Sequence, residues 1–350
     1  MMKNRIAWVD FVRASGMVMI IMVHSLAGVY GPSFLGKLLF AVNVPVFFVL
    51  SGYLFKEKKL SQVIKGGFFN LILPYVFSAI LIALIEQVYS IFPSWVNEFS
   101  AKDFVKGAFY GIGTSTVLPN KLAIPAIGAI WFLLAMFCGN ILFTLAFKLS
   151  NRMNKQGTLE FLVIIMVIAG FWTSKYIQLP WSLNAALVSQ SFYYAGYMIR
   201  KYDLVEKANL SLASIGLILW MISAQSGFFY LNTAFADNRL LAVLGGIGGS
   251  YFMMVVAKVI TESITTKYID YYGKLSLIVL SIHLVEMNSL KVNSFIAQHI
   301  FTITNSNLAI TYAIVFYRLL ITILAVVVIP KIPVVRSFYL NRQYPFFKKH

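Results

Sequence analysis

The sequence predicts an all-α protein, a polytopic membrane bundle of about ten transmembrane helices with its N-terminus and C-terminus both cytoplasmic. Composition is the first reason. Hydrophobic residues make up 59% of the 350 residues and charged residues 12%, with a mean hydropathy of +0.79, so the chain lacks the polar side chains that a water-exposed exterior requires. The other two reasons are the length of its apolar runs and the distribution of its basic residues.

Ten apolar runs have lengths close to the roughly 20 residues that a helix needs to cross the hydrocarbon core. In chain order they are 8–29, 35–55, 69–91, 126–148, 159–173, 183–199, 210–230, 239–260, 273–290 and 308–329. Helices are expected in all of them, because backbone polar groups inside lipid need partners within the segment. No long hydrophilic stretch interrupts these runs, so residues 1–350 are predicted to form a single membrane-embedded domain.

The basic residues orient the ten runs. With the N-terminus inside, seven Lys and Arg residues fall in outer segments, two more lie within spans, and the other twenty of the 29 fall in cytoplasmic segments. Lys and Arg concentrate in the cytoplasmic loops of membrane proteins, so this asymmetry predicts that both termini are inside. The seven outer residues are Lys37, Lys102, Lys106, Lys121, Lys175, Arg239 and Lys291.

Charge and cysteine content exclude other classes of protein. The net charge of +17 is scattered over loops and tails, so attraction to anionic lipid headgroups explains it better than a nucleic-acid partner does. Cys138 is the only cysteine, which excludes an internal disulfide and a cysteine metal cluster. No metal cofactor is expected.

The first run contains the most informative ionisable residues, because charged groups inside a bilayer are costly unless they face a polar interior. At 100° per residue, Arg13 and His24 lie about 20° apart on one helix face and about 16 Å apart along the axis, and Asp10 lies within about 60° of them. A structural interpretation is an Asp10–Arg13 salt bridge with a hydrogen-bonded histidine. The catalytic interpretation is that His24 accepts a proton as general base and Arg13 binds an anionic group.

Later runs contain few ionisable groups. Glu86 lies in the third run, His283 and Glu286 in the ninth, and Arg318 in the tenth. His283 and Glu286 are three residues apart and are expected to pair, so a structural role for His283 is as plausible as a catalytic one. Glu86 and Arg318 either pair across helices or lie near the outer edge, and no function is assigned to them.

Glycines cluster in the eighth run at positions 245, 246, 248 and 249. Their small-xxx-small spacing inside an apolar helix is typical of close helix packing in membranes. A phosphate-binding loop is not expected there, because the segment is apolar and helical. The eighth run is therefore predicted to lie very close to a neighbouring helix.

Five short segments occur in order along nearly the whole chain. The first two are Arg5-Ile-Ala-Trp-Val-Asp10-Phe-Val-Arg13, followed by ten residues and His24, and Val44-Pro-Val-Phe-Phe-Val-Leu-Ser51-Gly52-Tyr-Leu-Phe. The others are Ile130-Trp131-Phe132-Leu133, Phe192-Tyr-Tyr-Ala-Gly196-Tyr-Met-Ile-Arg200, and Gly273-Lys-Leu-Ser276 with His283 after six further residues. Together they resemble the motifs of the acyltransferase-3 superfamily of membrane O-acyltransferases, in its stand-alone form without an added esterase-like domain.

Two positions depart from the pattern of that superfamily. Ala14 stands where a glycine often follows the motif arginine, and Leu280 stands where an aromatic residue often precedes the later histidine. The first departure leaves Arg13 and His24 intact. The second concerns the segment that ends in His283, whose role is correspondingly open.

The resemblance implies an O-acetyltransferase of the bacterial cytoplasmic (inner) membrane. Such a protein moves an acyl group, most often acetyl, from cytoplasmic acyl-CoA to a hydroxyl of an extracytoplasmic or lipid-linked carbohydrate. Its partners would be acetyl-CoA as donor, a glycan acceptor and membrane lipids. Carried over residue by residue, His24 is the catalytic histidine and Arg13 its motif partner, with Arg13 and Arg5 as donor-binding candidates. The secondary positions are Asp10, Ser51, Trp131, His283 and Glu286.

Two alternatives to direct acyl transfer stay open. A small-molecule transporter fits the polar groups of the first run, since such groups also line translocation paths, and an amino-acid-handling membrane domain of the same fold is a related possibility. Within the acyltransferase interpretation, Ser51 is a candidate nucleophile for a covalent acetyl-enzyme. Its position nearer the cytoplasmic end equally suits tight helix packing.

Overall fold

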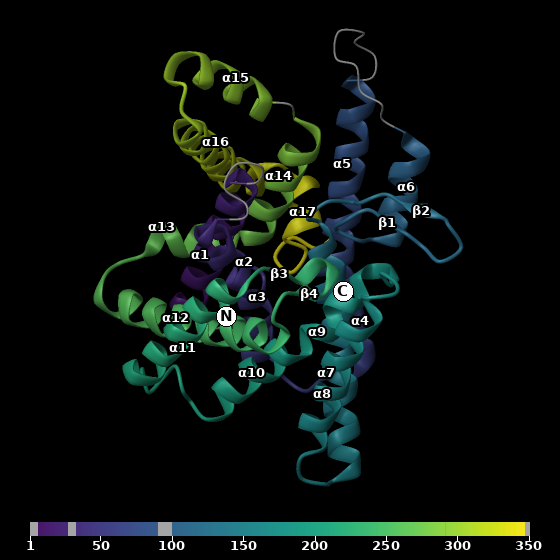
Figure 1. Cartoon of the computed structure of the whole chain (residues 1–350), viewed down its shortest axis with the longest axis vertical. Coiled ribbons are helices and arrows are strands. Elements are labelled where there is room, and N and C mark those ends of the chain that lie inside the picture. The colour runs from purple at the N-terminus through teal and green to yellow at the C-terminus, as the bar shows by residue number, and fades with distance from the viewer. Residues whose placement is uncertain (1–5, 27–32, 90–99, 291, 347–350) are drawn as a thin grey trace. The chain divides into compact units, whose positions relative to one another are not determined.

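The structure is a computed structural model that describes residues 6–26, 33–89, 100–290 and 292–346. Helices dominate these residues, and two short β-hairpins accompany them (Figure 1). By their contacts the residues form two compact units, each assembled from three parts of the chain. Unit 1 comprises Met1–Glu57, Ala146–Ile168 and Val188–Ser276; unit 2 comprises Lys58–Leu145, Ala169–Leu187 and Leu277–His350.

Among the described residues, six helical stretches are long and apolar enough to cross a membrane. They are Ala7–Leu26, Phe34–Tyr53, Leu60–Val88, Trp131–Met153, Arg239–Ser263 and Asn307–Lys331. Three shorter apolar helices, Thr158–Thr173, Leu210–Ser226 and Ser276–Ser289, coincide with further predicted runs. The helical character of the described residues is therefore confirmed, and these six stretches are long and apolar enough for the predicted spans, while the number of ten spans and the cytoplasmic location of both termini stay predictions.

In unit 1, helix α1 (Ala7–Leu26) packs against α2 (Phe34–Val42), α3 (Pro45–Tyr53), α12 (Arg239–Ser263) and α13 (Lys267–Lys274). The pair α2 and α3 replaces the uninterrupted helix predicted at 35–55. Proline in the first turn of α3 explains the break, because its ring nitrogen has no hydrogen to donate to a preceding carbonyl.

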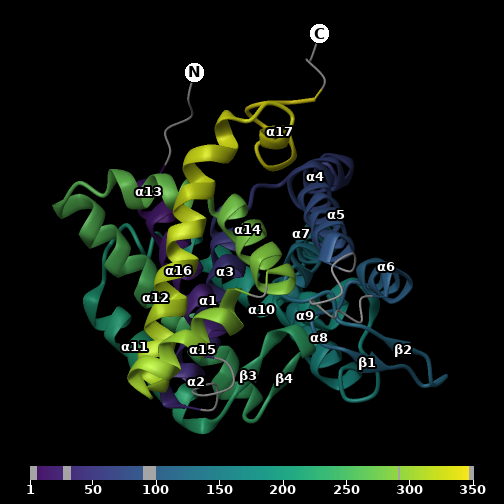
Figure 2. The ribbon, with the colours of Figure 1, turned by 90° about the horizontal axis from the view of Figure 1, so that it is seen from above.

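The remaining helices of unit 1 pack in pairs. Helix α10 (Gln190–Lys201) lies on α3, and α11 (Leu210–Ser226) lies along α12, as both views of the ribbon show (Figures 1 and 2). A hairpin of β3 (Phe229–Tyr230) and β4 (Phe235–Ala236), with the 3-10 turn Leu231–Thr233 between them, joins α11 to α12. The predicted run 183–199 is divided between α9 (Leu183–Val188) and α10.

The glycine cluster of α12 contacts α11 as its spacing predicted. A Cβ on Gly248 would lie 2.7 Å from the carbonyl oxygen of Gly216 in α11, and a Cβ on Gly249 would lie 2.9 Å from the ring of Trp220. Real Cβ atoms do not approach other atoms so closely, so the two backbones can touch only because side chains are missing there. Close helix packing is therefore confirmed for this cluster.

Unit 2 begins with α4 (Leu60–Gly67), which continues through the π-helical turn Phe68–Ile72 into α5 (Leu73–Tyr89). The π-helical turn precedes Pro74, which cannot donate a backbone hydrogen bond to the turn before it. Next come α6 (Ala101–Tyr110) and an antiparallel hairpin of β1 (Thr116–Val117) and β2 (Ala123–Ile124).

The boundary between the units falls within α7 (Trp131–Met153) and α8 (Thr158–Thr173), at the last residue of α9 and at the first residue of α14 (Ser276–Ser289). Unit 2 also contains the 3-10 turn Pro180–Ser182. The last part of unit 2 is again helical. It consists of α14 (Ser276–Ser289), α15 (Val292–Thr304), α16 (Asn307–Val328), the 3-10 turn Ile329–Lys331 and α17 (Val335–Tyr339).

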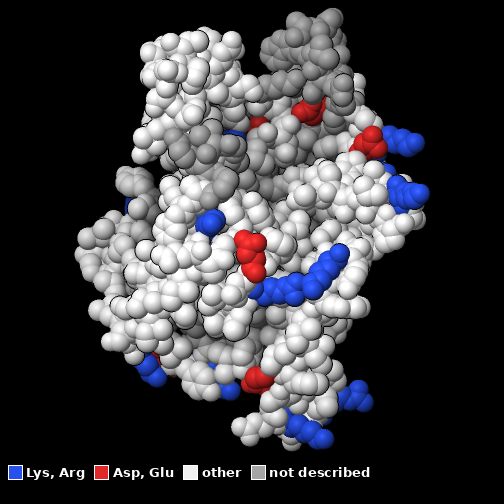
Figure 3. Space-filling model, viewed as in Figure 1, with Lys and Arg blue, Asp and Glu red and all other residues white. Residues whose placement is uncertain are grey.

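Large apolar side chains are exposed on several of the long helices. On α5, Val76, Ile80, Leu84 and Val88 follow one another at four-residue spacing and are each about half exposed. Four-residue spacing puts them on one helix face, and such a face suits lipid, since soluble proteins rarely expose one so large. The face of the molecule drawn in Figure 3 is mostly uncharged, with a few separated Lys, Arg, Asp and Glu side chains.

Candidate active site

The first and last of the five motif segments meet in unit 1. Gly273 of α13 lies so close to α1 that a Cβ there would collide with the carbonyl oxygen of Asp10, and it would lie 2.9 Å from the backbone nitrogen of Ala14. Only glycine permits this approach, because every other residue has the Cβ. Two segments from opposite ends of the sequence thus form one contact beside the first turns of α1.

Asp10 and Arg13 form the salt bridge that their spacing predicted. Arg13 Nη1 donates to Asp10 Oδ1 at 2.9 Å, and the side chains are 5% exposed for Asp10 and 29% for Arg13. The carboxylate holds the guanidinium in one orientation through a charge-assisted hydrogen bond. Because the Arg13 side chain is still partly exposed, an anionic group of a ligand can approach it.

The second and fourth motif segments also pack together in unit 1. A Cβ on Gly52 of α3 would collide with the carbonyl oxygen of Tyr193, and one on Gly196 of α10 would collide with the carbonyl oxygen of Val49. Each glycine therefore admits the backbone of the opposite helix. The pairing of α3 with α10 depends on both positions.

Tyr53, at the end of α3, links these segments to α1. Arg200 Nη1 of α10 donates to the Tyr53 carbonyl oxygen at 3.2 Å, which satisfies one of the carbonyls that a helix leaves unpaired at its C-terminus. The Tyr53 ring packs edge-on against Trp8 of α1, with ring centroids 5.0 Å apart. Four of the five motif segments therefore lie in unit 1, in contact with one another.

His24 lies in the last turn of α1 and is half-buried. It follows Asp10 by fourteen residues, which corresponds to a rise of about 21 Å along the helix. Ser51 is half-buried in α3, and its hydroxyl donates to the Phe47 carbonyl oxygen at 2.9 Å, within its own helix. Arg5 lies outside the described residues.

Glu286 and Arg318 form a buried ion pair in unit 2. Arg318 Nε of α16 donates to Glu286 Oε2 of α14 at 3.1 Å, and the two side chains are 4% and 2% exposed for Arg318 and Glu286. His283 Nδ1 lies 3.9 Å from the same carboxylate oxygen, which is too far for a hydrogen bond. The pairing predicted between His283 and Glu286 is therefore only a loose contact, because the guanidinium of Arg318 binds the carboxylate.

Trp131 also belongs to unit 2, at the first residue of α7, and is 6% exposed. Its ring covers Gly113, where a Cβ would lie 2.9 Å from the indole nitrogen Nε1. Three residues earlier, Gly128 adopts a left-handed φ of +76° and lies against the Asn288 side chain of α14. The Trp-containing segment is thus close to the helix that contains His283.

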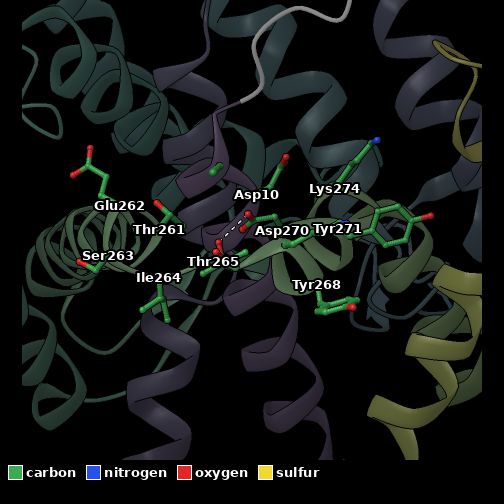
Figure 4. Close-up of a pocket in the computed structure, with 13 residues that line it drawn as sticks. Asp10, Thr261, Glu262, Ser263, Ile264, Thr265, Tyr268, Asp270, Tyr271 and Lys274 are labelled. Atoms are coloured by element: carbon green, nitrogen blue, oxygen red, sulfur yellow. Dashed lines mark hydrogen bonds between the residues drawn. The ribbon is translucent and has the colours of Figure 1, made fainter.

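An open pocket of about 730 Å³ lies beside the first turn of α1 in unit 1 (Figure 4). Its lining comes from α1, the end of α12, the connection between α12 and α13, and α13 itself. The predicted topology puts these ends at the cytoplasmic side. The lining residues are Ala7, Asp10, Thr261, Glu262, Ser263, Ile264, Thr265, Thr266, Lys267, Tyr268, Asp270, Tyr271 and Lys274.

Two acidic residues near this pocket are held by Lys258, a lysine of α12 that is only 9% exposed. Lys258 Nζ donates to Glu262 Oε1 at 2.9 Å and to Glu206 Oε2 at 2.7 Å. Through these contacts the buried Lys258 holds the segment that follows α10 against α12. This network was not predicted from the sequence. The four-residue spacing of Lys258 and Glu262 was the available signal, whereas the contact with Glu206 depends on the fold.

Comparison with known proteins gives one family. The acyltransferase-3 family model, which describes an acyltransferase domain, matches residues 6–330, almost the whole chain. Comparisons with curated proteins and with solved structures gave no match. The matched region includes His24, Arg13, Ser51, Trp131 and His283, and it lends no support to the transporter or amino-acid-handling alternatives.

Proposed function

Because the chain belongs to the acyltransferase-3 family, and is thus a membrane acyltransferase, we propose that it moves an acetyl group from cytoplasmic acetyl-CoA to a hydroxyl. The acceptor is an extracytoplasmic or lipid-linked carbohydrate in the bacterial cytoplasmic membrane. The observation that supports this most strongly is the family match over residues 6–330. The packing of four motif segments against one another in unit 1 is consistent with it.

His24 acts as the general base in this proposal. It takes the proton of the acceptor hydroxyl, and the hydroxyl oxygen attacks the thioester carbonyl carbon. The carbon–sulfur bond of the tetrahedral intermediate then breaks, and the thiolate of CoA takes the proton from His24. The products are an ester and CoA, so no external acid or oxidant is needed.

Arg13 guides the donor toward His24. Asp10 orients its guanidinium through a hydrogen bond of 2.9 Å, and the side chain is partly exposed. An oriented and partly exposed guanidinium suits the binding of a negatively charged ligand. The rise of about 16 Å from Arg13 to His24 is then bridged by the long arm of the donor. In this arrangement the donor binds near the Arg13 end of α1, and the acceptor hydroxyl approaches the His24 end.

Ser51 has no step in this mechanism. Its hydroxyl donates to the Phe47 carbonyl oxygen within α3, a contact that is typical of serine within membrane helices, and its small side chain permits close helix packing. Direct transfer therefore needs fewer assumptions than a covalent acetyl-enzyme. A Ser51→Ala variant that keeps acetyl transfer would agree with the direct mechanism.

The proposed role of His24 is tested by replacing it with alanine in a strain that lacks the native gene. We expect acetylation of surface glycans, measured by mass spectrometry, to fall by about 100-fold or more, as is typical when a general base is removed. Arg13→Ala should also reduce it. Ser15→Ala is a matched control, because Ser15 is half-buried on α1 and its hydroxyl donates to the Phe11 carbonyl oxygen within the same helix.

Normal acetylation by the His24 variant, at normal levels in the membrane, would contradict the role of general base. A mass difference of one acetyl group between cells with and without the gene would identify both the reaction and the acceptor. If no acetylated product depends on the gene, the proposed carbohydrate acceptor is wrong.

A further inference from the structure

Two of the residues that line the pocket beside the first turn of α1 are lysines. Lys267 and Lys274 lie on α13, seven residues apart, so they fall on one helix face about 10 Å apart along the axis. Within the part of the chain that the structure describes, neither lysine forms an ion pair. Both are therefore available to a negatively charged ligand.

The acidic residues of the pocket have partners. Asp10 accepts from Arg13 at 2.9 Å, Glu262 accepts from Lys258 at 2.9 Å, and Asp270 accepts from the Thr266 hydroxyl at 2.8 Å, the dashed line in Figure 4. Asp270 keeps its negative charge because its partner is a neutral hydroxyl, and Lys258 shares one positive charge between Glu262 and Glu206. Attraction for an anion is therefore local to the ammonium groups of Lys267 and Lys274, the positively charged residues of the pocket lining.

Aromatic side chains stand beside the two lysines. Tyr271 follows Lys267 by four residues and precedes Lys274 by three, so its ring belongs to the same face of α13. The Lys274 ammonium lies 6.0 Å from the centre of that ring. Tyr268 is 88% exposed at the rim. Exposed aromatic rings stack on nucleobases without regard to sequence.

We infer that this pocket binds the phosphorylated adenosine part of the acyl donor, with Lys267 and Lys274 on its two separate phosphate groups and a tyrosine ring against the adenine. The inference rests on the proposed function, in which the donor is acetyl-CoA. Coenzyme A has a pyrophosphate and a ribose phosphate on opposite sides of its ribose. Two lysines two helical turns apart match such a ligand better than they match a single phosphate.

The length of the donor agrees with this location. An extended pantetheine chain has about 12 bonds from its terminal oxygen to its sulfur, comparable to about four peptide residues or roughly 14 Å. Asp10 lies in the wall of the pocket, and the rise from Arg13 to His24 is about 16 Å. A nucleotide held in the pocket, with its pyrophosphate near Arg13, brings the thioester to the level of His24.

The test measures binding of free CoA to the purified full-length protein in detergent by calorimetry, so it does not require an acceptor. We expect Lys267→Gln and Lys274→Gln each to weaken CoA binding about tenfold, the effect of losing one hydrogen bond to a charged group. Binding of pantetheine, which has no phosphate, should be unchanged. Lys155→Gln is the matched control, since Lys155 is exposed on the same predicted side but outside the pocket.

Tyr268→Ala and Tyr271→Ala separate the aromatic contact from the charges. At least one of them should weaken binding of CoA and of adenosine 3′,5′-bisphosphate while leaving pantetheine binding unchanged. Unaltered melting temperatures would show that the variants are folded. In transfer assays, the lysine variants should raise the KM for acetyl-CoA and leave kcat nearly constant, because the nucleotide is remote from the reacting carbonyl.

The outcomes separate this inference from the proposed function. If the unmodified protein binds CoA and the double lysine variant binds it equally well, the pocket is not the nucleotide site, although the donor assignment stands. If the unmodified protein does not bind CoA, both are wrong. If the double variant keeps CoA affinity but loses co-purifying phosphatidylglycerol, the lysines bind a lipid headgroup and the inference is overturned.

Discussion

In unit 2, Glu286 and Arg318 form an ion pair in which both side chains are almost fully buried. Glu286→Gln should lower the free energy of unfolding by about 3 kcal/mol, since it removes the carboxylate that neutralises the buried guanidinium of Arg318. Denaturation of the purified protein in detergent, followed by circular dichroism, measures the change.

The double variant Glu286→Gln with Arg318→Met is the control for this prediction. Removing both charges should recover most of the lost stability, because a buried ion pair and an uncharged pair of similar volume are often nearly equivalent. Simple addition of the two single-variant effects would show that the two side chains do not interact.

Two ion pairs, Asp10–Arg13 and Glu286–Arg318, show how much of the site could be predicted at the scale of residues. The Asp10–Arg13 salt bridge was predictable, because both partners lie on one helix turn and spacing alone brings them together. Glu286 was assigned to His283 on the same argument, but the fold brings Arg318 from another helix to 3.1 Å. A contact between helices depends on their packing, which periodicity does not contain.

At the scale of helices, the tight approach of α3 and α10 gives a second prediction. Gly196→Ala should destabilise unit 1 by about 3 kcal/mol, because its Cβ would meet the Val49 carbonyl oxygen, which cannot move without shifting α3. Thermal denaturation of the purified variant tests this.

Gly66→Ala provides the comparison. Gly66 lies in α4 with no atom within 4 Å of a Cβ built on it, so alanine there should stabilise the helix by up to about 1 kcal/mol. If Gly196→Ala proves as harmless as Gly66→Ala, the α3–α10 contact is looser than described.

Helices were predictable from hydropathy, but their interruptions were not. Nine of the ten runs coincide with apolar helical stretches, since about 20 apolar residues specify a span regardless of packing. The break before Pro45 and the π-helical turn before Pro74 were missed. A proline in a membrane helix can be absorbed by a kink, a bulge or a break, and neighbouring helices select among them.

At the scale of the whole molecule, the predicted topology is open to direct measurement. In a chain with Cys138→Ala, a cysteine introduced at Phe109 should react with a membrane-impermeant maleimide in intact cells. A cysteine at Lys155 should react only after the membrane is opened. Phe109 is 80% exposed on α6 and Lys155 is exposed between α7 and α8, so burial does not limit either reaction.

If position 155 were labelled in intact cells and position 109 only after the membrane is opened, the orientation of the chain would be the reverse of the predicted one. Asp10 and the α13 pocket would then lie outside, away from a cytoplasmic donor, and both the transfer mechanism and the nucleotide site would have to be abandoned. Labelling of both positions in intact cells would instead mean that the number of spans between them is even. The experiment therefore tests the premise on which the mechanism depends.

The motif segments illustrate what a sequence conveys about a whole molecule. Their order and residue types indicated the family, which the match over residues 6–330 confirms. Their meeting in unit 1, through Gly273 on Asp10 and Gly52 on α10, is a property of the folded chain. The α13 pocket was likewise invisible in the sequence, because its lysines and tyrosines resemble any polar connector between two spans.

The Asp10–Arg13 salt bridge has a consequence for biosynthesis. Helix α1 is made first, while α12 and α13, which enclose its charged end, are made more than two hundred residues later. During that interval the nascent helix must stay in or near lipid without them. A countercharge one turn away lets it do so, since an ion pair within one helix lowers the cost of membrane insertion before any partner exists. Arg13→Ala would leave Asp10 without this countercharge during that interval, so transfer by this variant should be counted per inserted molecule.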